Sequence, residues 1–341
     1  MLVKKTFIKA DHRPDLASSH IDNSHITELP LSNDASYENI RTDTSINTIC
    51  FGPRNDKVLM NIEHLMKEDQ RLLILYYEDM FKRWTFTCRS GDVNFIVRKS
   101  NRESAMLKPT CIYIRGAITK SNDVMSQQLA HFHQLLMLWP YKLICGPNVA
   151  YNNESKLFQL NSSLKKASHS LESISIGKSY VVKGVNQYLN LPKDKSFIVK
   201  SLSAVRSKVV DDRTYKNWSF KSLDHLPTLF QEKAEGLDIR VHILYGKTFA
   251  KMSTHKSNTD YRYQDKFELC DVEPSEDLKT FCKLVAQDEH NEFMGLDFIK
   301  TEHGFQVLEA NPCPGWSAYH PFNSASIDPF LVALKEVLTS D

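Results

Sequence analysis

Three oxygen-bearing side chains near the end of the sequence have the spacing of a metal site on a hairpin. Asp297 lies in an apolar stretch, and Glu309 and Asn311 follow it by twelve and fourteen residues. Because side chains on a strand repeat every two residues, Glu309 and Asn311 share a face. A short turn at residues 301–304 would place Asp297 almost opposite Glu309. Three hard oxygen ligands suit Mg²⁺, which binds phosphate oxygens and water as well, although the alternative is a hairpin with acids on its solvated face.

Two lysines far upstream could supply positive charge to a phosphate group. Lys156 is expected to begin a helix, and Lys200 follows the apolar strand residues 197–199. Lysine is a point-charge partner for phosphate, but a single lysine is most often a solvated surface charge. Lys200 is the less ordinary of the two, because lysines rarely continue a buried run.

An extended segment that is followed by an acid could bind a nucleoside. Gln231, Glu232, Lys233 and Ala234 belong to an expected strand, and Asp238 comes four residues after it. The extended backbone can offer N–H and C=O groups to the edge of an adenine ring. A carboxylate shortly afterwards can accept hydrogen bonds from ribose hydroxyls.

The short motifs of several other enzyme classes are missing. The tripeptides GKS at 177–179 and GKT at 246–248 look like half of a phosphate-binding P-loop, but the earlier glycine of that motif is replaced by Glu172 and Val241. The sequence contains no G-x-G-x-x-G, G-x-S-x-G or H-E-x-x-H motif. A P-loop, a hydrolase elbow and a zinc-protease helix are therefore not expected.

The elements that must position these residues alternate between strands and helices. In the first half, apolar runs and alternation predict strands at 46–51, 71–77, 84–88, 93–99 and 110–115, and helices at 56–69 and 122–139. In the second half, we expect several short strands, a helix at 275–291, paired strands at 294–300 and 304–310, and a last helix at 328–338. This pattern predicts a mixed α/β protein with a first boundary near Gly146.

Composition excludes several classes of protein. The charged residues nearly balance, with 43 Lys+Arg against 41 Asp+Glu, so a protein that coats nucleic acid is not expected. No apolar run approaches the roughly 20 residues of a membrane helix, and no signal peptide is recognisable. Seven cysteines without a C-x-x-C pair favour reduced thiols, and hence a cytoplasmic protein that binds neither membrane nor nucleic acid.

The order of the candidate residues along the chain resembles the ATP-grasp superfamily over residues 147–338. EANPCPGW, which contains Glu309 and Asn311, looks like the terminal metal motif of that family, and MGLDFI is similar to its aspartate strand. The interval from Gln231 to Asp238 resembles that between the hinge and the ribose-binding acid of D-alanine–D-alanine ligases. The resemblance implies an α/β (α+β) ATP-grasp fold, in which an N-terminal α/β domain precedes central and C-terminal domains that clamp ATP between two sheets.

The resemblance also predicts how the chain divides into domains. Residues 1–45 would be a polar N-terminal extension, and residues 46–146 the N-terminal α/β domain. Residues 147–235 would form the central ATP-grasp domain, and residues 236–341 the C-terminal domain with the Mg²⁺ site.

Several segments are similar to the microviridin-type peptide ligases, or graspetide maturases, which are relatives of the ribosomal-protein glutamate ligases. These segments are SKLFQL, VKSLSAVRS, FQEKAEGLDIRVHILYGKTFAKM and the tripeptide DYR at 260–262. CIYIRG resembles that family's strand before the ATP-binding half, which makes Arg115 a candidate for substrate contact. The chain departs from the family in three ways: it does not start with a hydrophobic strand, residues 201–216 contain no glycine, and Gly295 stands where D-alanine ligases carry an arginine.

The resemblance implies an ATP-dependent ligase that joins a carboxylate to an amine or a hydroxyl through an acyl phosphate, with a ribosomal precursor peptide as the substrate. ATP and Mg²⁺ would be the cofactors. The nucleotide would contact Lys156, Lys200, Gln231, Glu232, Lys233, Ala234 and Asp238, and the metal would contact Asp297, Glu309 and Asn311. Arg262, or after it Arg240, would stabilise the acyl-transfer charge, although Arg240 could instead form a salt bridge with Asp238.

Other functions stay open from the sequence alone. The protein could be an amino-acid or dipeptide ligase, or an enzyme that adds glutamates to a protein tail. It could also be a kinase of the inositol-phosphate type, which would need many basic residues at its acceptor site, or a binding module without catalysis. Analogy with the family favours a homodimer.

Overall fold

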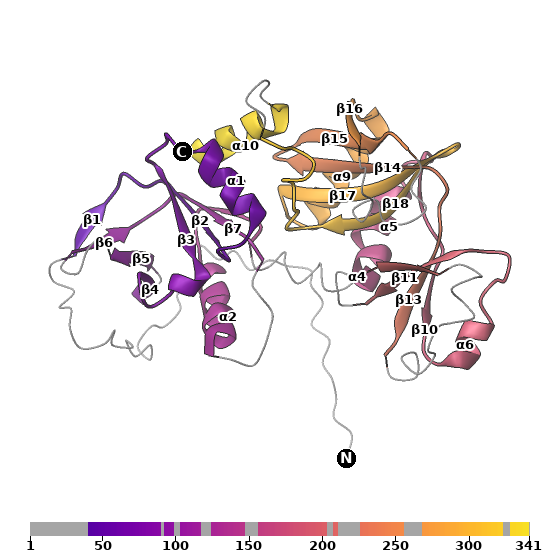
Figure 1. Cartoon of the computed structure of the whole chain (residues 1–341), viewed down its shortest axis with the longest axis horizontal. Coiled ribbons are helices and arrows are strands. Elements are labelled where there is room, and N and C mark those ends of the chain that lie inside the picture. The colour runs from indigo at the N-terminus through magenta and orange to yellow at the C-terminus, as the bar shows by residue number, and fades with distance from the viewer. Residues whose placement is uncertain are drawn as a thin grey trace, which may run out of the picture.

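The computed structural model describes most of the chain as strands and helices arranged in four sheets. The described residues are 40–89, 92–98, 103–116, 124–146, 156–202, 207–210, 226–255, 268–322 and 328–340. Figure 1 shows the two sheets of the first half beside the two sheets of the second half. The mixed α/β arrangement predicted from the sequence is confirmed.

The first sheet is parallel. Its strands in spatial order are β3 (Leu72–Tyr76), β2 (Thr48–Gly52), β7 (Cys111–Ile114) and β8 (Lys142–Ile144). All residues of β2 and β7 are buried, as expected for a parallel sheet with both faces covered. Helix α1 (Lys57–Leu65) contacts one face and helix α2 (Val124–Leu136) the other. Helix α1 begins where the Asp56 carboxylate accepts two backbone N–H groups of the first turn.

The second sheet packs near α2. Its strands in spatial order are β1 (Arg41–Asp43), β6 (Ser104–Leu107), β5 (Asp92–Arg98) and β4 (Trp84–Arg89), and the short helix η3 (Tyr77–Asp79) precedes β4. Aromatic side chains fill the space between this sheet, the first sheet and α2, with Phe132 within 5.5 Å of both Phe51 and Trp84 by ring centroids. Strand β1 falls inside the predicted polar extension, and residues 1–39 lie outside the described residues.

The third sheet carries the segment that the sequence analysis assigned to a nucleoside. It is antiparallel, with the spatial order β10 (Ser179–Val182), β13 (Thr228–Glu232), β11 (Phe197–Ser201) and β12 (Ser207–Val210). Helix α6 (Val185–Leu189) packs on this sheet through Tyr188, and the helices α4 (Lys156–Asn161) and α5 (Ser163–Ser168) precede it in the chain. Strand β13 is buried on both faces, since Phe230 packs with Tyr188 while Leu229 belongs to the core of the next sheet.

The fourth sheet carries the predicted metal ligands. Its six strands in spatial order are β16 (Leu269–Val272), β15 (Lys247–Ser253), β14 (Leu237–Leu244), β17 (Phe293–Thr301), β18 (Gly304–Asn311) and β9 (Ile174–Ile176). Helix α9 (Glu276–Asp288), which Ser275 caps, covers one face of this sheet together with α4 and α5. The opposite face is therefore the one available to a ligand.

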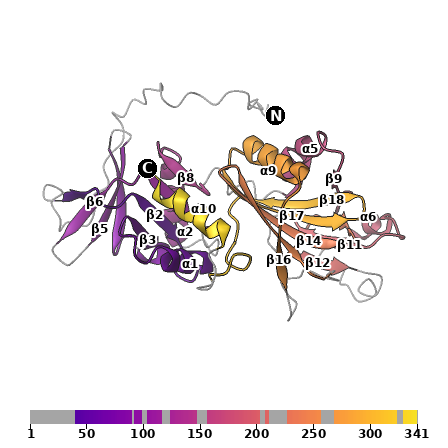
Figure 2. The same cartoon turned by 90° about the horizontal axis from the view of Figure 1, so that it is seen from above.

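The last helix, α10 (Pro329–Thr339), belongs to the core of the first sheet. Phe330, Leu331 and Leu334 share a buried cluster with α1, and both Figure 1 and Figure 2 show the two helices side by side. The Thr48 hydroxyl donates a 2.5 Å hydrogen bond to the carbonyl of Leu338. Residues of α10 and of the first sheet thus share one core. The division into domains stays a prediction. No helix among the described residues is long and apolar enough to cross a bilayer.

Candidate functional site

The β17–β18 hairpin aligns the three predicted metal ligands. The register places Asp297 opposite Glu309, close to the pairing expected from the sequence, and it places Asn311 opposite Gly295. The turn closes at Gly304, whose φ of +132° lies in the region that favours glycine. A register shift between Asp297 and Phe298 leaves Leu308 of β18 without a partner in the ladder, as in a β-bulge. Asp297 and Glu309 therefore form a cross-strand pair on one face of the sheet.

Two lysines from separate elements converge on one oxygen of Glu309. Lys156 Nζ, at the start of α4, lies 3.0 Å from Glu309 Oε2, and Lys200 Nζ, on β11, lies 3.6 Å from it. The side chains of Lys156, Lys200 and Glu309 are 11%, 6% and 23% exposed. We call these three residues, with Asp297 and Arg240, the charge cluster. It joins the third sheet to the fourth at the place where the sequence predicted phosphate contacts.

The charge cluster shifts the titration of its members. Burial alone would raise the pKa of Glu309, but Lys200 and Lys156 outweigh it and lower that pKa to about 2. Burial lowers the pKa of Lys200, and Glu309 opposes that change only in part. Glu309 is therefore ionised at neutral pH. A buried lysine whose charge is costly to keep gains from any further anion that binds beside it.

Arg240 occupies the space that the glycine at position 295 leaves. Its Nη1 atom lies 2.8 Å from Asp297 Oδ2, and its side chain is 5% exposed. Arg240 and Asp297 face each other across the β14–β17 ladder. A Cβ atom on Gly295 would overlap the guanidinium group of Arg240. The guanidinium group of Arg240, from the neighbouring strand β14, thus lies where a side chain at position 295 would begin.

The predicted nucleoside segment contains a buried amide without a hydrogen-bond partner. Gln231 is 1% exposed, and neither its Nε2 nor its Oε1 atom has a partner among the described residues. The next residue, Glu232, ends β13 and accepts a 3.3 Å hydrogen bond from the Tyr180 hydroxyl. Unpaired buried amides are costly, so such a group indicates a polar ligand. The edge of an adenine ring, with a donor beside an acceptor, fits an amide.

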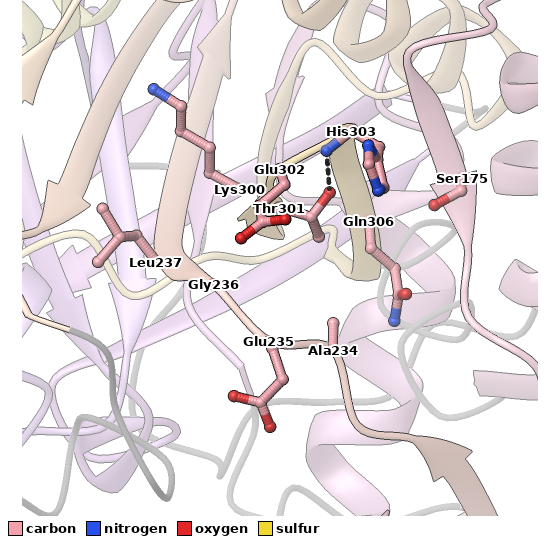
Figure 3. A pocket seen from close by; sticks show the side chains of 10 residues that line it. All are labelled: Ser175, Ala234, Glu235, Gly236, Leu237, Lys300, Thr301, Glu302, His303 and Gln306. Atoms are coloured by element: carbon pink, nitrogen blue, oxygen red, sulfur yellow. Dashed lines mark hydrogen bonds between the residues drawn. The ribbon is translucent and has the colours of Figure 1, made fainter. Parts of the chain in front are cut away.

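A pocket of about 650 Å³ lies beside this segment. Figure 3 shows it between the chain at Ala234 and Gly236 and the hairpin turn at His303, with Gln306 below the turn. Its volume is in the range of small-molecule sites. Its lining includes Ala234 but none of the three predicted metal ligands. The pocket therefore does not contain the charge cluster.

The oxygen ligands fit Mg²⁺ in their chemistry. Asp297 and Glu309 supply carboxylates, and Asn311 supplies an amide oxygen. That oxygen accepts a 3.0 Å hydrogen bond from the backbone N–H of Cys313. Within the described ranges, no three Asp, Glu, His or Cys side chains gather into a metal site. Two carboxylates with few other protein ligands are typical of Mg²⁺ that binds together with phosphates, and not of zinc.

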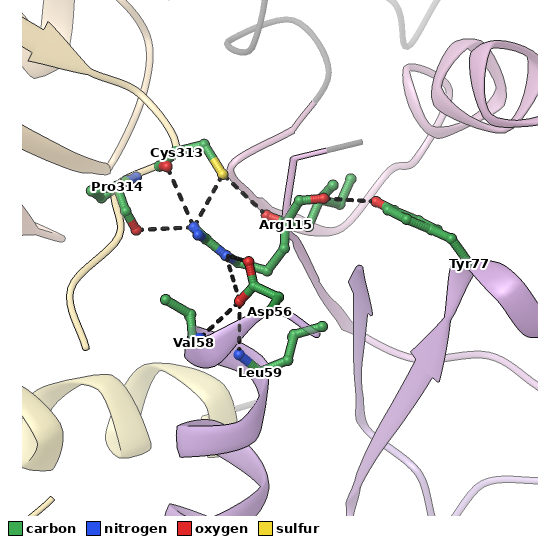
Figure 4. A network of polar contacts seen from close by, with 8 residues as sticks. Asp56, Val58, Leu59, Tyr77, Arg115, Cys313 and Pro314 are labelled. Atoms are coloured by element: carbon green, nitrogen blue, oxygen red, sulfur yellow. Dashed lines mark hydrogen bonds and ion pairs between the residues drawn. The ribbon is translucent and has the colours of Figure 1, made fainter. Parts of the chain in front are cut away.

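Arg115 connects the first sheet to the loop after the metal motif. Its Nε lies 3.2 Å from Asp56 Oδ2, and its Nη1 donates to the carbonyl of Pro314 at 2.9 Å and to Cys313 Sγ at 3.3 Å. Figure 4 shows these contacts and the hydrogen bond from Tyr77 to the Arg115 carbonyl. Arg115 is 8% exposed, so its observed contacts are within the protein. Its predicted contact with substrate stays a prediction.

The remaining site residues predicted from the sequence are Asp238, Lys233 and Arg262. Asp238 is the second residue of β14 and donates its N–H to Ser253 Oγ at 3.0 Å, and Lys233 follows β13. Arg262 lies outside the described residues. The sequence analysis gave no role to His242 and His320. His242 accepts a hydrogen bond from Arg240, and His320 contacts His242. The available signal was the two-residue spacing of Arg240 and His242 on one strand, which puts both on one face.

Comparison with known proteins identifies the fold. No protein-family model matches the sequence, and no curated protein is significantly similar to it. The structure is similar to the macrocyclase MdnC of Microcystis aeruginosa MRC bound with precursor peptide MdnA, with a TM-score of 0.68 and 13% identity over 86% of this chain and 100% of that one. It is similar to the ATP-grasp ligase PsnB in complex with a precursor variant, Mg and ADP, with a TM-score of 0.66 and 16% identity over 86% and 99%.

A more distant likeness points to the same fold. D-alanyl-alanine synthetase A of Vibrio cholerae O1 biovar eltor str. N16961 matches with a TM-score of 0.52 and 13% identity over 87% of this chain and 98% of that one. At these identities the likeness shows the fold. The ATP-grasp fold predicted from the sequence is therefore confirmed.

Proposed function

We propose, from the ATP-grasp fold, that this protein is an ADP-forming, Mg²⁺-dependent ligase that joins a carboxylate of a precursor peptide to an amine or a hydroxyl. The observation that carries the proposal is the convergence of Lys156 and Lys200 on Glu309, with Asp297 directly opposite. Two cations and two carboxylates in one half-buried place suit a polyphosphate with its metal. MdnC and PsnB, which share the fold, were solved with precursor peptides.

The residues of the chain divide the work of binding between them. Asp297, Glu309 and Asn311 would hold Mg²⁺, which when bound neutralises phosphate oxygens and polarises the transferred group. Lys156 and Lys200, which now contact Glu309, are within reach of the same phosphate oxygens. The adenine edge would form hydrogen bonds with the amide of Gln231 and with the backbone of residues 232–234. Asp238 would accept hydrogen bonds from the ribose hydroxyls.

The chemistry follows as two substitutions. A carboxylate oxygen of the substrate attacks the γ-phosphorus of ATP, the bond to the β–γ bridging oxygen breaks, and ADP leaves. An amine or hydroxyl of the peptide then attacks the acyl carbon, loses its proton, and displaces phosphate. Arg240, a buried cation that is paired with Asp297, would stabilise the charge of the acyl phosphate and of the developing oxyanion.

A second candidate function is an amino-acid or dipeptide ligase. The likeness to D-alanyl-alanine synthetase A favours it, because that protein shares the fold over most of both chains. The peptide substrate is preferred here, because the two structures with higher TM-scores are the peptide-modifying ones. A kinase differs from both ligases in leaving the phosphate on its acceptor.

The experiment that tests the proposal is ADP release with Mg²⁺ and ATP, in the presence and absence of hydroxylamine, against pools of carboxylate peptides and of amino acids. Peptide-dependent ADP with a trapped hydroxamate, and a loss of water from the peptide without the trap, would support a peptide ligase. Amino-acid-dependent ADP would support the second candidate. ADP with a phosphorylated acceptor and no hydroxamate would contradict both.

Replacing Lys200 by methionine is expected to weaken ADP binding by roughly 10- to 100-fold, the effect of losing one charged hydrogen bond. The side chain is 5% exposed, so methionine keeps its apolar stem and fills the same space. Calorimetric titration with Mg·ADP measures the change. Lys195→Met, at an exposed lysine before the same strand, is the control. Equal affinity in Lys200→Met and wild type would show that Lys200 contacts no phosphate.

Replacing Gly295 by alanine is expected to lower turnover by roughly 10- to 100-fold, because the added methyl group would displace the Arg240 guanidinium. ADP binding should stay near the wild-type level, since Gly295 belongs to no predicted nucleotide contact. Steady-state kinetics with the active peptide pool measures the effect. Gly116→Ala is the control, because a Cβ there meets nothing within 4 Å. Unchanged turnover would mean that Arg240 does not act from this position.

The assembly and location of the protein are further proposals. We infer a homodimer by analogy with the fold family, and light scattering of the full chain tests it. A cytoplasmic location agrees with the seven cysteines, all of which are unpaired in the structure.

A further inference from the structure

A continuous chain of hydrogen bonds runs from Asp297 into the protein interior. Arg240 binds Asp297 through Nη1 at 2.8 Å, and its Nε donates to His242 Nε2 at 3.3 Å. His242 Nδ1 and His320 Nε2 are 3.0 Å apart, and His320 Nδ1 is 3.0 Å from Asp328 Oδ2. We call Arg240, His242, His320 and Asp328 the relay. It joins the predicted metal ligand to the N-cap residue of α10.

The polarity of the relay is fixed by its two ends. A guanidinium group only donates, so His242 Nε2 must accept and its proton must lie on Nδ1. His242 Nδ1 then donates to His320 Nε2, which leaves the proton of His320 on Nδ1. That proton is donated to Asp328, which as a carboxylate only accepts. Both imidazoles are therefore neutral in one defined tautomer, and a second proton on either would place two donors face to face.

The surroundings of the relay favour neutral imidazoles. His242 is fully buried and His320 is 1% exposed, with His320 stacked on the Phe330 ring at 4.2 Å between centroids. Burial, followed by the charge of Arg240, lowers the pKa of His242 well below its usual range. Burial also lowers the pKa of His320, although Asp328 opposes it. Within the described chain the charged groups that act on the pair are Arg240, Lys251, Asp271 and Asp328.

The far end of the relay is anchored. Asp328 caps α10 by accepting the N–H of Phe330 at 2.8 Å, and it also accepts from Lys251 Nζ at 3.1 Å. Helix α10 is in turn packed on the first sheet through Phe330 and Leu334. Phe330 and Lys251 therefore hold the Asp328 carboxylate in place, and this carboxylate anchors the relay at the start of α10.

We propose that His242 and His320 are positioning residues, which hold the Arg240 guanidinium above Gly295 and against Asp297. The catalytic consequence rests on the function proposed above, whereas the protonation pattern does not. An arginine side chain has many rotamers, and its contacts with Asp297, His242 and the Tyr319 ring restrict them. Fixing Nε by His242 leaves one orientation of the planar fork. The hydrogen bonds of the relay thus orient a guanidinium group that β14 carries, beside the position of Gly295 on β17.

Two substitutions at His242 separate positioning from packing. His242→Leu keeps the apolar volume but cannot accept from Arg240, and kcat should fall by roughly 10- to 100-fold with the KM for ATP changed by less than about twofold. His242→Gln can accept from Arg240 through Oε1 and donate to His320 through Nε2, and it should recover most of kcat. Wild-type kcat in His242→Leu, or equal losses in both variants, would overturn the proposal.

Ser163→Ala is the control for lost stability. It removes a buried 2.5 Å hydrogen bond to Glu289, on the face of the fourth sheet that α5 and α9 cover. Thermal unfolding compares it with the His242 variants. A kcat loss in Ser163→Ala equal to that in His242→Leu would overturn the positioning role, because stability alone would then explain both.

The protonation pattern is tested without any substrate. In the full chain labelled with ¹⁵N-histidine, the nitrogen spectrum at neutral pH should show two neutral imidazoles protonated at Nδ1, which disappear singly in His242→Gln and His320→Gln. An Nε2–H tautomer or an imidazolium at either residue would overturn the relay. A wild-type protein with this spectrum and no ligase turnover would refute the proposed function and leave the relay standing.

Discussion

Glu309→Gln is expected to lower turnover by about a thousandfold or more, while the protein stays folded. Glu309 is the residue on which Lys156 and Lys200 converge, and its pKa of about 2 keeps it ionised in any neutral assay. Glutamine has the same shape but no charge, so it turns a charged metal ligand into a weaker neutral one and removes one of the charges that organise the phosphates. Effects of this size are typical for the loss of electrostatic stabilisation at a reacting phosphoryl group.

Turnover of the active peptide pool and thermal unfolding measure this prediction together. Glu292→Gln is the matched control, since Glu292 is an exposed acid just before β17. Because the neutral side chain would leave Lys156 and Lys200 beside each other, Asp297→Asn provides a second variant at the opposite ligand. Wild-type turnover in either folded variant would remove the metal site from this hairpin.

Arg240→Met is expected to lower kcat by roughly 100- to 1000-fold, with little change in ADP affinity. Arg240 is buried and fixed by Asp297 and His242, so it carries a preorganised charge that water does not screen. Its predicted action is on the acyl phosphate and not on the nucleotide. Hydroxamate formation in a single turnover measures the first step, and calorimetry measures ADP affinity.

Arg240→Lys is the companion variant, because it keeps the charge that balances Asp297 but loses the planar fork. It should fold like the wild type and still lose most of kcat. Arg262→Met tests the other arginine named from the sequence, which lies outside the described residues. A large loss in Arg262→Met with none in Arg240→Met would assign the charge-stabilising role to Arg262.

The hairpin of the candidate site was predictable because its information is local. Alternating side chains and a short turn bring Asp297 close to Glu309, and a β-bulge at Leu308, which the spacing does not reveal, sets the final pairing. The helix start at Lys156 and the burial of Lys200 after an apolar strand were also readable from neighbouring residues. Each of these features depends on fewer than about 15 residues of sequence.

The contacts that the sequence did not reveal are those between distant segments. The pairing of Arg240 with Asp297 depends on the register between β14 and β17, with helix α9 between them in the chain. The addition of α10 to the first sheet depends on a core shared by both ends of the chain. Strands of three or four residues, such as β8 and β9, are too short to show a period.

Arg115 illustrates why a residue type alone did not settle its place. A charged residue after a buried strand is a reasonable candidate for a ligand contact, and the family resemblance pointed the same way. The structure shows it bound to Asp56 and to the carbonyl of Pro314, so it fixes the loop that follows the metal motif. One sequence cannot distinguish a strand end that meets a substrate from one that meets another loop.

The central claim is that the charge cluster holds a magnesium-bound adenine nucleotide, and calorimetric titration of the full chain with ADP tests it most directly. The account predicts saturable binding of one ADP per chain, at least about tenfold tighter with Mg²⁺ than with a chelator, and loss of that Mg²⁺ effect in Glu309→Gln. The absence of saturable binding, or equal affinity with and without Mg²⁺, would contradict the account.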